Sequence, residues 1–473
     1  MALPPDTAAA LDRLTQFGVR LGLERMRCLL AALGDPQADL PVVLVAGTNG
    51  KGTVSALLAS FASAARYRTG LYTSPHLETV EERLRLDGAP IGGERLGGLL
   101  ERVLGAAGEA LEEPPTYFEA LTACALVWFA EEKVDLAVLE VGLGGRFDAT
   151  NATEPRLSVI TSIDLDHREY LGSTRAEVAR EKAGVMRADR PVVVADGPPE
   201  VTEVLAEEAR RAGARLVPAT ETLRVDAVQR FKPFADPLER RQRIWVRDEA
   251  GERRVYEIAL AGRHQAENLA LALVAAETLS EEGWERLTSR ALTRGCRGCR
   301  WPGRLEEVSL PDGGRVLLDV AHNPAGAAAL AVALDDLGEP VDLVFGVLAE
   351  KEAEPMLAAL APRARRITLT RPSGPRGREA ASLVPLVPRV PEPGSSGPPG
   401  RAGRERSRDV EVVEAPGDAL VAALRRAAGR IVVACGSLAM VGELRAFLHR
   451  RYGVPQPAVE MTVGGVETDS EAP

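Results

Sequence analysis

Lysine is scarce in this sequence of 473 residues. Of its 58 basic residues only five are lysine, at positions 51, 133, 182, 232 and 351, and the others are arginine. Because arginine supplies positive charge almost everywhere else, a retained lysine is a candidate for chemistry that a guanidinium group cannot perform. Lys51, Lys182 and Lys351 lie in the segments GTNGKGT, AREKAGVM and LAEKEAE. We expect no such role for Lys133 and Lys232.

Cysteine is also rare, with five scattered residues in the whole chain. So few cysteines exclude a disulfide framework. Cys296 and Cys299 form the only close pair, and a zinc site would need two further ligands at matching spacing, which the sequence does not provide. We therefore expect no metal or redox role for this pair.

Long apolar runs and an excess of positive charge are absent as well. No apolar run approaches the ~18 residues that span a bilayer. The N-terminal MALPPDTAAALDRL lacks the basic and apolar regions of a secretory signal. The net charge of −10 argues against general binding to nucleic-acid phosphates. We expect a cytoplasmic protein without a membrane or nucleic-acid partner, and the length favours two domains.

Strand-like and helix-like runs alternate along the first half of the chain. The apolar runs are short, β-branched and almost continuous, as in parallel strands that are covered on both faces. This alternation predicts an α/β fold with a doubly wound sheet. The expected strands are 41–47, 69–74, 136–141, 157–163 and 191–195, and the expected helices are 53–66, 117–132 and 174–187. A small antiparallel appendage over 222–260 and a helix over 264–279 follow.

A second alternation, after Trp301, predicts a smaller α/β domain. Its expected strands are 315–321, 341–347, 365–370, 410–414 and 430–437, and its expected helices are 324–336, 352–360, 416–428 and 438–451. The Arg/Gly-rich segment 294–304 marks the boundary. We expect a first domain over 1–300, a second over 301–452 with a disordered insertion at about 391–409, and a flexible tail over 453–473.

The segment GTNGKGT, Gly47 to Thr53, stands between an expected strand and an expected helix. Such a turn directs backbone N–H groups and the positive end of the helix dipole at one place, which favours an anion. In the usual P-loop a hydroxyl residue follows the lysine directly, whereas here Gly52 intervenes between Lys51 and Thr53. We expect phosphate binding, with Lys51 reaching the β- and γ-phosphates. The alternative is an ordinary turn with Thr53 as the helix N-cap.

Polar residues follow several expected strands of the first domain. Ser74 and His76 follow one, Glu140 ends another, and Asp164, Asp166 and His167 follow a third. Ligands collect at these strand ends in open α/β sheets, and a buried carboxylate is costly unless it is paired or bound to a metal. Together with the glycine-rich turn, these residues predict a Mg-ATP site, although His76 alone is also consistent with a loop histidine.

Ten segments in order along the chain resemble the folylpolyglutamate synthase/dihydrofolate synthase group of the Mur ligase family. In the first half these are GTNGKGT, SPHL (74–77), YFEALT (117–122), LEVGLGGRFDATN (139–151), SIDLDH (162–167) and REKAGVM (180–186). In the second half they are HQAENLALAL (264–273), WPGRLE (301–306), LLDVAHNP (317–324) and CGSL (435–438). The cell-wall ligases of the family resemble GTNGKT[ST] instead, so Gly52 is typical of the folate branch.

This resemblance implies a P-loop doubly wound ATPase domain followed by a smaller Rossmann-like α/β domain, with the site between them completed by domain closure. It implies an ATP-dependent ligase that phosphorylates a folate carboxylate, and L-glutamate then attacks the acyl phosphate. Dihydropteroate is a further possible acid substrate. The expected cofactors are ATP and two Mg²⁺ ions, and a monomer is expected.

The resemblance also implies roles for individual residues. The residues for ATP are Gly47, Thr48, Asn49, Gly50, Lys51, Gly52, Thr53, Asn268, Arg304 and Asp319. Those for metal are Ser74 and Glu140 at one ion, and His167 and Lys182, the latter as a carbamate, at the second. Those for substrate are Phe118, Arg146 and Asp148 for the folate, and His322 and Ser437 for glutamate. Lys51, Lys182 and His322 are the catalytic candidates. Lys351 matches the basic position of a D-K-D segment whose first Asp is Glu350 here.

Several alternatives stay open. Lys182 is also consistent with a helix-surface lysine paired with Glu181 or Glu177, and the loop of Arg146 with a turn that needs positive φ at Gly144 or Gly145. Arg20 stands near a position that is acidic in relatives acting on dihydropteroate, which weakens that activity, and Ala439 departs from relatives near Ser437. The other candidate functions are a Mur-type ligase for a non-folate acid and a catalytically silent nucleotide-binding protein.

Overall fold

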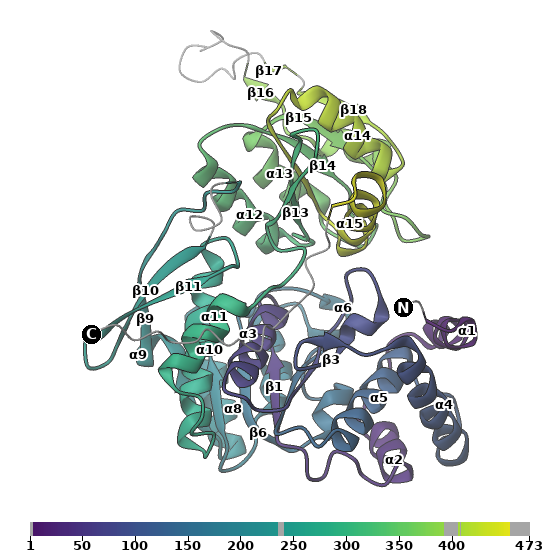
Figure 1. Cartoon of the computed structure of the whole chain (residues 1–473), viewed down its shortest axis with the longest axis vertical. Coiled ribbons are helices and arrows are strands. Elements are labelled where there is room, and N and C mark those ends of the chain that lie inside the picture. The colour runs from purple at the N-terminus through teal and green to yellow at the C-terminus, as the bar shows by residue number, and fades with distance from the viewer. Residues whose placement is uncertain (1–2, 235–240, 392–404, 407, 455–473) are drawn as a thin grey trace, which may run out of the picture.

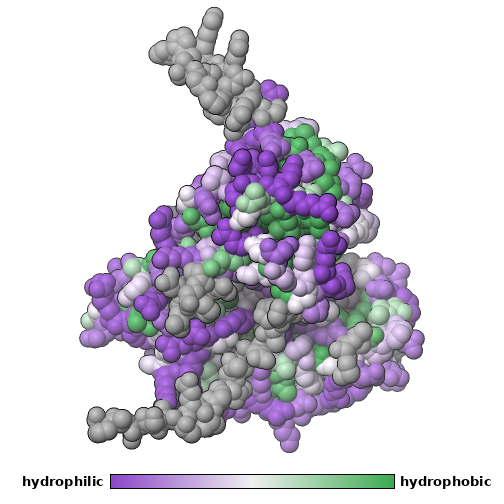
Figure 2. Space-filling view, turned by 45° about the horizontal axis from the view of Figure 1, so that its top comes forward, coloured by the Kyte–Doolittle hydropathy of each residue, from purple (hydrophilic) through white to green (hydrophobic). Residues whose placement is uncertain are grey.

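The computed structural model describes residues 3–234, 241–391, 405–406 and 408–454. Two α/β units lie one above the other, with the C-terminal unit at the top of Figure 1. The described surface mixes hydrophilic and hydrophobic residues, and on the face shown in Figure 2 the hydrophilic ones predominate. No helix in the described part of the chain is long and apolar enough to cross a membrane.

The N-terminal unit is built on an eight-stranded sheet in the order β4-β3-β2-β5-β1-β6-β7-β8. Its strands are β1 (Val42–Ala46), β2 (Thr69–Tyr72), β3 (Leu84–Leu86), β4 (Ala89–Pro90), β5 (Leu136–Glu140), β6 (Pro155–Ile160), β7 (Pro191–Val194) and β8 (Arg215–Pro218). In this order the six strands β2, β5, β1, β6, β7 and β8 are parallel to one another, and β3 and β4 add an antiparallel edge. All five strands expected for this sheet are therefore confirmed.

Helices cover both faces of this sheet. They are α1 (Pro5–Leu14), α2 (Glu24–Ala32), α3 (Lys51–Ala64), α4 (Gly93–Ala110), α5 (Tyr117–Glu131), α6 (Arg168–Leu171), α7 (Arg175–Lys182), α8 (Pro199–Ala212), α9 (Ala219–Thr222), α10 (His264–Glu281) and α11 (Ser289–Gly298). Alternate residues of the central strand belong to different cores: Val42 and Leu44 pack in the cluster with α5, and Val43 and Val45 in the cluster with α3 and α10. This two-sided burial is the doubly wound architecture that the apolar runs predict.

A three-stranded antiparallel sheet follows, as expected, in the order β11-β10-β9. Its strands are β9 (Leu223–Val228), β10 (Gln242–Asp248) and β11 (Arg253–Ile258). Ile244 and Ile258 pack in the core of the N-terminal unit. Phe231, just after β9, is instead buried in a core cluster of the C-terminal unit. The appendage thus contacts both units.

The C-terminal unit has a six-stranded sheet in the order β12-β13-β19-β14-β15-β18, in which β12 alone is antiparallel. The strands are β12 (Glu306–Ser309), β13 (Arg315–Asp319), β14 (Val341–Phe345), β15 (Ala364–Leu369), β18 (Asp409–Val412) and β19 (Ile431–Cys435). The helices are α12 (Pro324–Leu337), α13 (Ala353–Leu360), α14 (Pro416–Ala427) and α15 (Leu438–Tyr452). Short 3₁₀ turns complete the chain: η1 (Thr15–Phe17), η2 (Val80–Arg83), η3 (Ala149–Ala152), η4 (Ala183–Val185), η5 (Ala361–Arg363) and η6 (Ala380–Leu386).

The structure corrects two expectations of local structure. The segment 294–304 is not simply a connection, because α11 continues through Gly298 and its Cys296 is fully buried. A Cβ on Gly295 would lie 2.6 Å from the ring of Phe61, so this glycine allows α11 to pack closely on α3. The helix expected over 174–187 ends at Lys182 and continues as η4.

The expected insertion and tail fall largely outside the described residues. At the edges of the insertion, β16 (Val390–Pro391) pairs with β17 (Glu405–Arg406) in an antiparallel bridge, while 392–404 and 407 are not described. Of the expected tail, only residues 453 and 454 are described.

Candidate active site

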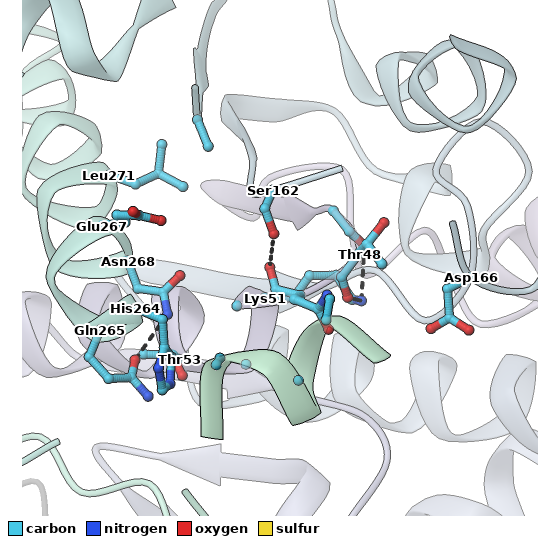
Figure 3. Close-up of a pocket in the computed structure, with 18 of the residues that line it drawn as sticks. Thr48, Lys51, Thr53, Ser162, Asp166, His264, Gln265, Glu267, Asn268 and Leu271 are labelled. Atoms are coloured by element: carbon cyan, nitrogen blue, oxygen red, sulfur yellow. Dashed lines mark hydrogen bonds between the residues drawn. The ribbon is translucent and has the colours of Figure 1, made fainter. Parts of the chain in front are cut away.

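A cavity of about 920 Å³ lies where the C-terminal ends of the two parallel sheets face each other. Its walls come from both units: the loop after β1 and Glu140 from the first, Asp319 and His322 from the second. We call the segment from Gly47 to Thr53 the phosphate loop. Figure 3 shows side chains of α10, among them Glu267 and Asn268, on one side of this loop and Asp166 on the other. The residues expected from the sequence that line it are Gly47, Thr48, Asn49, Gly50, Lys51, Gly52, Thr53, Ser74, Glu140, His167, Lys182, Asn268, Arg304, Asp319 and His322.

The phosphate loop requires glycine at two positions, Gly47 and Gly50. Gly47 has φ of +141° and Gly50 has φ of +88°, both in the region that favours glycine. A Cβ on Gly47 would lie 1.8 Å from Thr161 Oγ1, and one on Gly50 would lie 2.3 Å from Asn268 Oδ1. Gly50 is the N-cap of α3, so the alternative of Thr53 as the N-cap is wrong. The start of α3 is free of a side-chain cap and faces the cavity, as an anion site requires.

The loop after β6 holds the phosphate loop in place. The Thr48 N–H donates to Ser162 O at 2.8 Å, and the Asp164 N–H donates to Thr48 Oγ1 at 3.0 Å. Ser162 Oγ donates to Asn49 O at 3.3 Å, a bond drawn in Figure 3. These bonds use the Thr48 hydroxyl and the backbone of the loop, and they fix its shape.

Two lysines converge on one carbonyl. Lys51 Nζ donates to Gly47 O at 3.0 Å and to Thr48 O at 3.1 Å, and Lys182 Nζ donates to Gly47 O at 2.7 Å. Lys182 is only 4% exposed, and burial, with the charge of Lys51 beside it, lowers its pKa to about 7. Glu177 accepts from the backbone at the start of its own helix. The alternative of a surface lysine paired with a neighbouring glutamate is therefore wrong.

A buried carboxylate lies beside the phosphate loop. Glu140, at the end of β5, is 5% exposed and accepts from the Ser74 N–H through Oε2 at 3.1 Å. Burial raises the pKa of Glu140, and the charge of Lys51 opposes that rise. The carboxylate and the Ser74 side chain line the same cavity. They offer hard oxygen donors of the kind that Mg²⁺ takes.

A second polar cluster bridges the two units. Asp166 pairs with Lys351 of the C-terminal unit at 3.2 Å, and His167 Nε2 lies 3.9 Å from Asp166 Oδ2. Burial lowers the pKa of His167, and Asp166 opposes the shift. In the described ranges no three His, Cys, Asp or Glu side chains gather as a metal site by themselves. An ion here would take its remaining ligands from the nucleotide and water, as Mg²⁺ commonly does.

The C-terminal unit contributes a carboxylate and a neutral imidazole. Asp319 ends β13 and accepts from the Leu305 N–H at 2.9 Å. Burial raises the pKa of Asp319 to about 6, although Arg304 opposes the shift. Burial, with Arg304 nearby, lowers the pKa of His322 to about 3, so this imidazole is neutral at pH 7. A neutral imidazole can both donate and accept a hydrogen bond.

A further contact between the units was not expected from the sequence. Asn323 Nδ2 donates to Asn49 Oδ1 at 3.0 Å, while Asn323 Oδ1 accepts from the Gly326 N–H and caps α12. The phosphate loop therefore contacts the second unit directly. In the sequence this asparagine stands out only as an N-cap before proline.

The loop after β5, which carries Arg146 and Asp148, is held by its own backbone. Asp148 accepts from the N–H groups of Leu143 and Thr150 at 2.9 and 3.0 Å, so its carboxylate shapes its own loop. Arg146 pairs with Glu208 at 3.4 Å and does not line the cavity. Gly144 has φ of +69°, as the structural alternative for this loop requires.

Two other expected substrate residues stand behind the cavity wall. Phe118 packs against Gly142, where a Cβ would lie 2.6 Å from its ring, and it contacts Tyr72 with ring centroids 5.9 Å apart. Ser437 precedes α15 and is 1% exposed, and its Oγ has no partner within the described part of the chain. Neither residue is among those that line the cavity.

The cavity is also lined by two acidic residues for which no role was expected, Asp196 and Glu267. Burial, with Asp196 nearby, raises the pKa of Glu267. Asn268 Nδ2 donates to Gln265 Oε1 at 2.9 Å, which fixes the orientation of the Asn268 amide. Glu267 and Gln265 lie in the HQAEN segment and could have been considered from their neighbours.

Comparisons with known proteins agree with this architecture. Residues 45–276 match the Mur ligase middle domain, and residues 303–438 match the Mur ligase glutamate ligase domain. The dihydrofolate synthase/folylpolyglutamate synthase of Bacillus subtilis is 39% identical over 355 residues, which are 73% of this chain and 80% of that protein.

Solved structures of similar proteins cover almost the whole chain. Escherichia coli FolC in complex with DHPP and ADP matches with a TM-score of 0.79 and 30% identity, over 94% of this chain and 98% of that one. A bifunctional folylpolyglutamate synthase/dihydrofolate synthase with Mn, AMPPNP and L-glutamate bound matches with a TM-score of 0.77 and 31% identity, over 94% and 98%.

Proposed function

This chain belongs to the Mur ligase family, in the group of folylpolyglutamate and dihydrofolate synthases, and we propose on this basis how its cavity carries out the reaction. The protein is an ATP-dependent ligase that joins L-glutamate to the carboxylate of a folate. The observation that carries the proposal is the meeting of the phosphate loop with Glu140, Lys182 and His322 around one cavity.

The reaction needs ATP because a carboxylate is a poor electrophile. One carboxylate oxygen attacks the γ-phosphorus, ADP leaves, and the resulting acyl phosphate carries a good leaving group. The glutamate amine then attacks the acyl carbon, a C–N bond forms, the C–O bond to phosphate breaks, and the departing phosphate takes up the proton that the amine loses. Positioning and charge stabilisation supply most of the rate enhancement in phosphoryl transfer.

The chain's own groups fit the phosphates of the nucleotide. The start of α3, which has no side-chain cap, and the N–H groups of the phosphate loop favour a polyphosphate. Lys51 is held at the loop by two carbonyls, ready to exchange these for phosphate oxygens. We assign Asn268, Arg304 and Asp319 to holding the nucleotide, which their place in the same cavity supports.

The residues present also fit divalent metal. Ser74 and Glu140 would hold one ion, and His167 with a modified Lys182 a second. A bound divalent ion neutralises charge on the transferring phosphoryl group. The similar enzyme with Mn, AMPPNP and L-glutamate supports a metal-dependent reaction.

We assign Lys182 a carbamate. A pKa near 7 leaves much of the amine neutral at physiological pH, and only the neutral amine attacks CO₂. The new N–C bond releases a proton and converts a cation into an anion. Lys51 beside it would stabilise this anion, whereas an uncarbamylated ammonium would repel a metal ion.

His322, which lines the cavity as a neutral imidazole, is assigned to the incoming glutamate together with Ser437. We assign Phe118, Arg146 and Asp148 to the folate. They would act from behind the wall of the cavity. We keep dihydropteroate as a second acid substrate, because the Bacillus subtilis relative is named for both activities. Arg20, which stands near the position that is acidic in relatives acting on dihydropteroate, pairs with Glu113.

The working units are 1–300 and 301–452. We propose that the protein acts as a monomer in the cytoplasm. The test supplies purified protein with ATP, Mg²⁺ and labelled glutamate, and with tetrahydrofolate, dihydropteroate or a muramyl nucleotide in parallel. Incorporation with tetrahydrofolate is expected. Incorporation only with the muramyl substrate, or with none of the three, would overturn the proposal.

A further inference from the structure

We propose that Trp301 is a positioning residue, which seats the connection between the two units on Gly52 and thereby holds Arg304 in the nucleotide cavity. This inference deepens the proposed function and rests on the nucleotide-binding role given to Arg304. It also explains why glycine occupies the position that is a hydroxyl residue in the usual P-loop.

The contact between Gly52 and Trp301 is tighter than a Cβ usually allows. A Cβ on Gly52 would lie 3.0 Å from Trp301 Cζ2, 3.1 Å from Nε1 and 3.2 Å from Cε2. Gly52 stands in the first turn of α3, one residue after Lys51, where the helix meets the cavity. Gly52 does not have a positive φ, so its backbone conformation does not require glycine. The indole, and not the backbone, is therefore the reason for glycine here.

Trp301, the first residue after the proposed boundary, packs against the N-terminal unit. Its side chain is half-buried against the core cluster that contains α3, α10 and α11. Only two residues later, Gly303 O accepts from the Val320 N–H at 2.9 Å. The Leu305 N–H donates to Asp319 Oδ2 at 2.9 Å. The connection is thus fixed to the first unit at Trp301 and to the second at Gly303 and Leu305.

Arg304 lies between these fixed points and faces the reaction site. It lines the main cavity and, with Trp301, Gly52, Ser74 and Glu140, a smaller cavity of about 60 Å³ beside it. Its positive charge acts on Glu140, His264, Asp319 and His322, adding to the effect of burial on the pKa of each or opposing it. A guanidinium in reach of both units is well placed to hold a phosphate chain.

The usual P-loop carries its hydroxyl residue directly after the lysine, and in this chain a Cβ at that position, 52, points at the indole of Trp301. A serine or threonine at position 52 would push the indole by a few tenths of an ångström, and the connection that carries Arg304 would have to adjust with it. The hydroxyl is available one position later, on Thr53, which lines the cavity. The arrangement of this loop and the sequence of the connection are therefore coupled through one van der Waals contact.

The first experiment compares steady-state kinetics of Trp301→Ala, Trp301→Phe and Trp284→Ala. Trp284 is the matched control, because it is half-buried against the same core cluster but lines neither cavity. We expect Trp301→Ala to lower kcat/KM for ATP by about 10- to 100-fold, as a misplaced binding group does. Trp301→Phe should retain most of the activity. Trp284→Ala should retain all of it, with a melting temperature similar to that of Trp301→Ala.

The second experiment asks whether Trp301 acts through Arg304. Arg304→Ala alone should lower kcat/KM for ATP, and adding Trp301→Ala to it should change kcat/KM by no more than about twofold, because coupled residues are not additive. Full multiplication of the two losses, or a Trp301→Ala variant with unchanged kcat/KM for ATP, would overturn the inference. An Arg304→Ala variant with normal ATP kinetics would instead overturn the nucleotide role of Arg304 in the proposed function.

A parallel cycle tests the contact itself and does not need the alanine variant of Trp301 to be stable. Gly52→Ala should lower kcat/KM for ATP in the wild-type background, and its effect should shrink in the Trp301→Phe background, whose smaller ring leaves space. An equal loss in both backgrounds would show that the indole is not what excludes a side chain at position 52.

Discussion

Replacing Lys182 with arginine should abolish turnover while leaving the fold intact. Arginine keeps the positive charge and is at least as long as lysine, but a guanidinium does not form a carbamate with CO₂. Lys133→Arg is the matched control, because Lys133 is an exposed lysine of the same unit. The control should keep full activity, so a loss confined to Lys182→Arg would report the chemistry of this one amine.

The size of the effect follows from burial at Lys182. With a pKa of about 7, about half of its amines are neutral at pH 7, whereas roughly one in 3,000 would be neutral at an ordinary lysine pKa. The site therefore raises the reactive fraction by about a thousandfold. As pH falls below 7 the amine becomes protonated, so the carbamate and the activity should both decline towards pH 6.

The assay pairs kinetics with a direct signal. Protein equilibrated with ¹³C-bicarbonate should give one carbamate carbon resonance in ¹³C NMR, present in the wild type and in Lys133→Arg and absent in Lys182→Arg. Removal of CO₂ should lower activity, and bicarbonate should restore it. A fully active Lys182→Arg enzyme, or a carbamate resonance that persists in it, would refute this reasoning.

Three further outcomes are expected. Gly47→Ala should weaken ADP binding in calorimetry and lower stability by about 1–3 kcal/mol, because its Cβ would lie 1.8 Å from Thr161 Oγ1 at a φ of +141°; unchanged binding and stability would contradict the account of the loop. Asn323→Ala, which removes the 3.0 Å bond to Asn49, should raise KM for ATP and leave the nucleotide-bound protein less compact in small-angle scattering, and identical profiles would argue against this contact in closure. Nucleotide affinity should fall as pH drops through about 6, where Asp319 takes up a proton because burial raises its pKa, and Asp319→Asn should flatten that dependence; an equally steep profile in the variant would assign the titration elsewhere.

The fold could be predicted largely from apolar periodicity. Each strand expected in both sheets is present, because parallel strands buried on two faces produce continuous apolar runs that composition cannot hide. The helix α11 was missed for the opposite reason. Its arginines and glycines suggest a connection, and only the spacing of Leu292 and Cys296 marks its buried face.

The site was predictable where backbone geometry demands a residue type. Gly47 and Gly50 need positive φ, and Glu140 is conspicuous as a carboxylate in an apolar strand. Contacts between the units were not predictable, since Asn323 meets Asn49 only after both sheets have formed. The motif also does not reveal that the carboxylate of Asp148 accepts hydrogen bonds from the backbone of its own loop.

The transfer of oxygen from the folate to phosphate tests the acyl-phosphate reaction most directly. A folate labelled with ¹⁸O in the reacting carboxylate is incubated with ATP, Mg²⁺, L-glutamate and the enzyme, and the inorganic phosphate is analysed by mass spectrometry. One ¹⁸O atom is expected in the phosphate for each amide bond formed, because the carboxylate oxygen leaves with the phosphoryl group. Amide formation with unlabelled phosphate would contradict activation of the carboxylate by ATP.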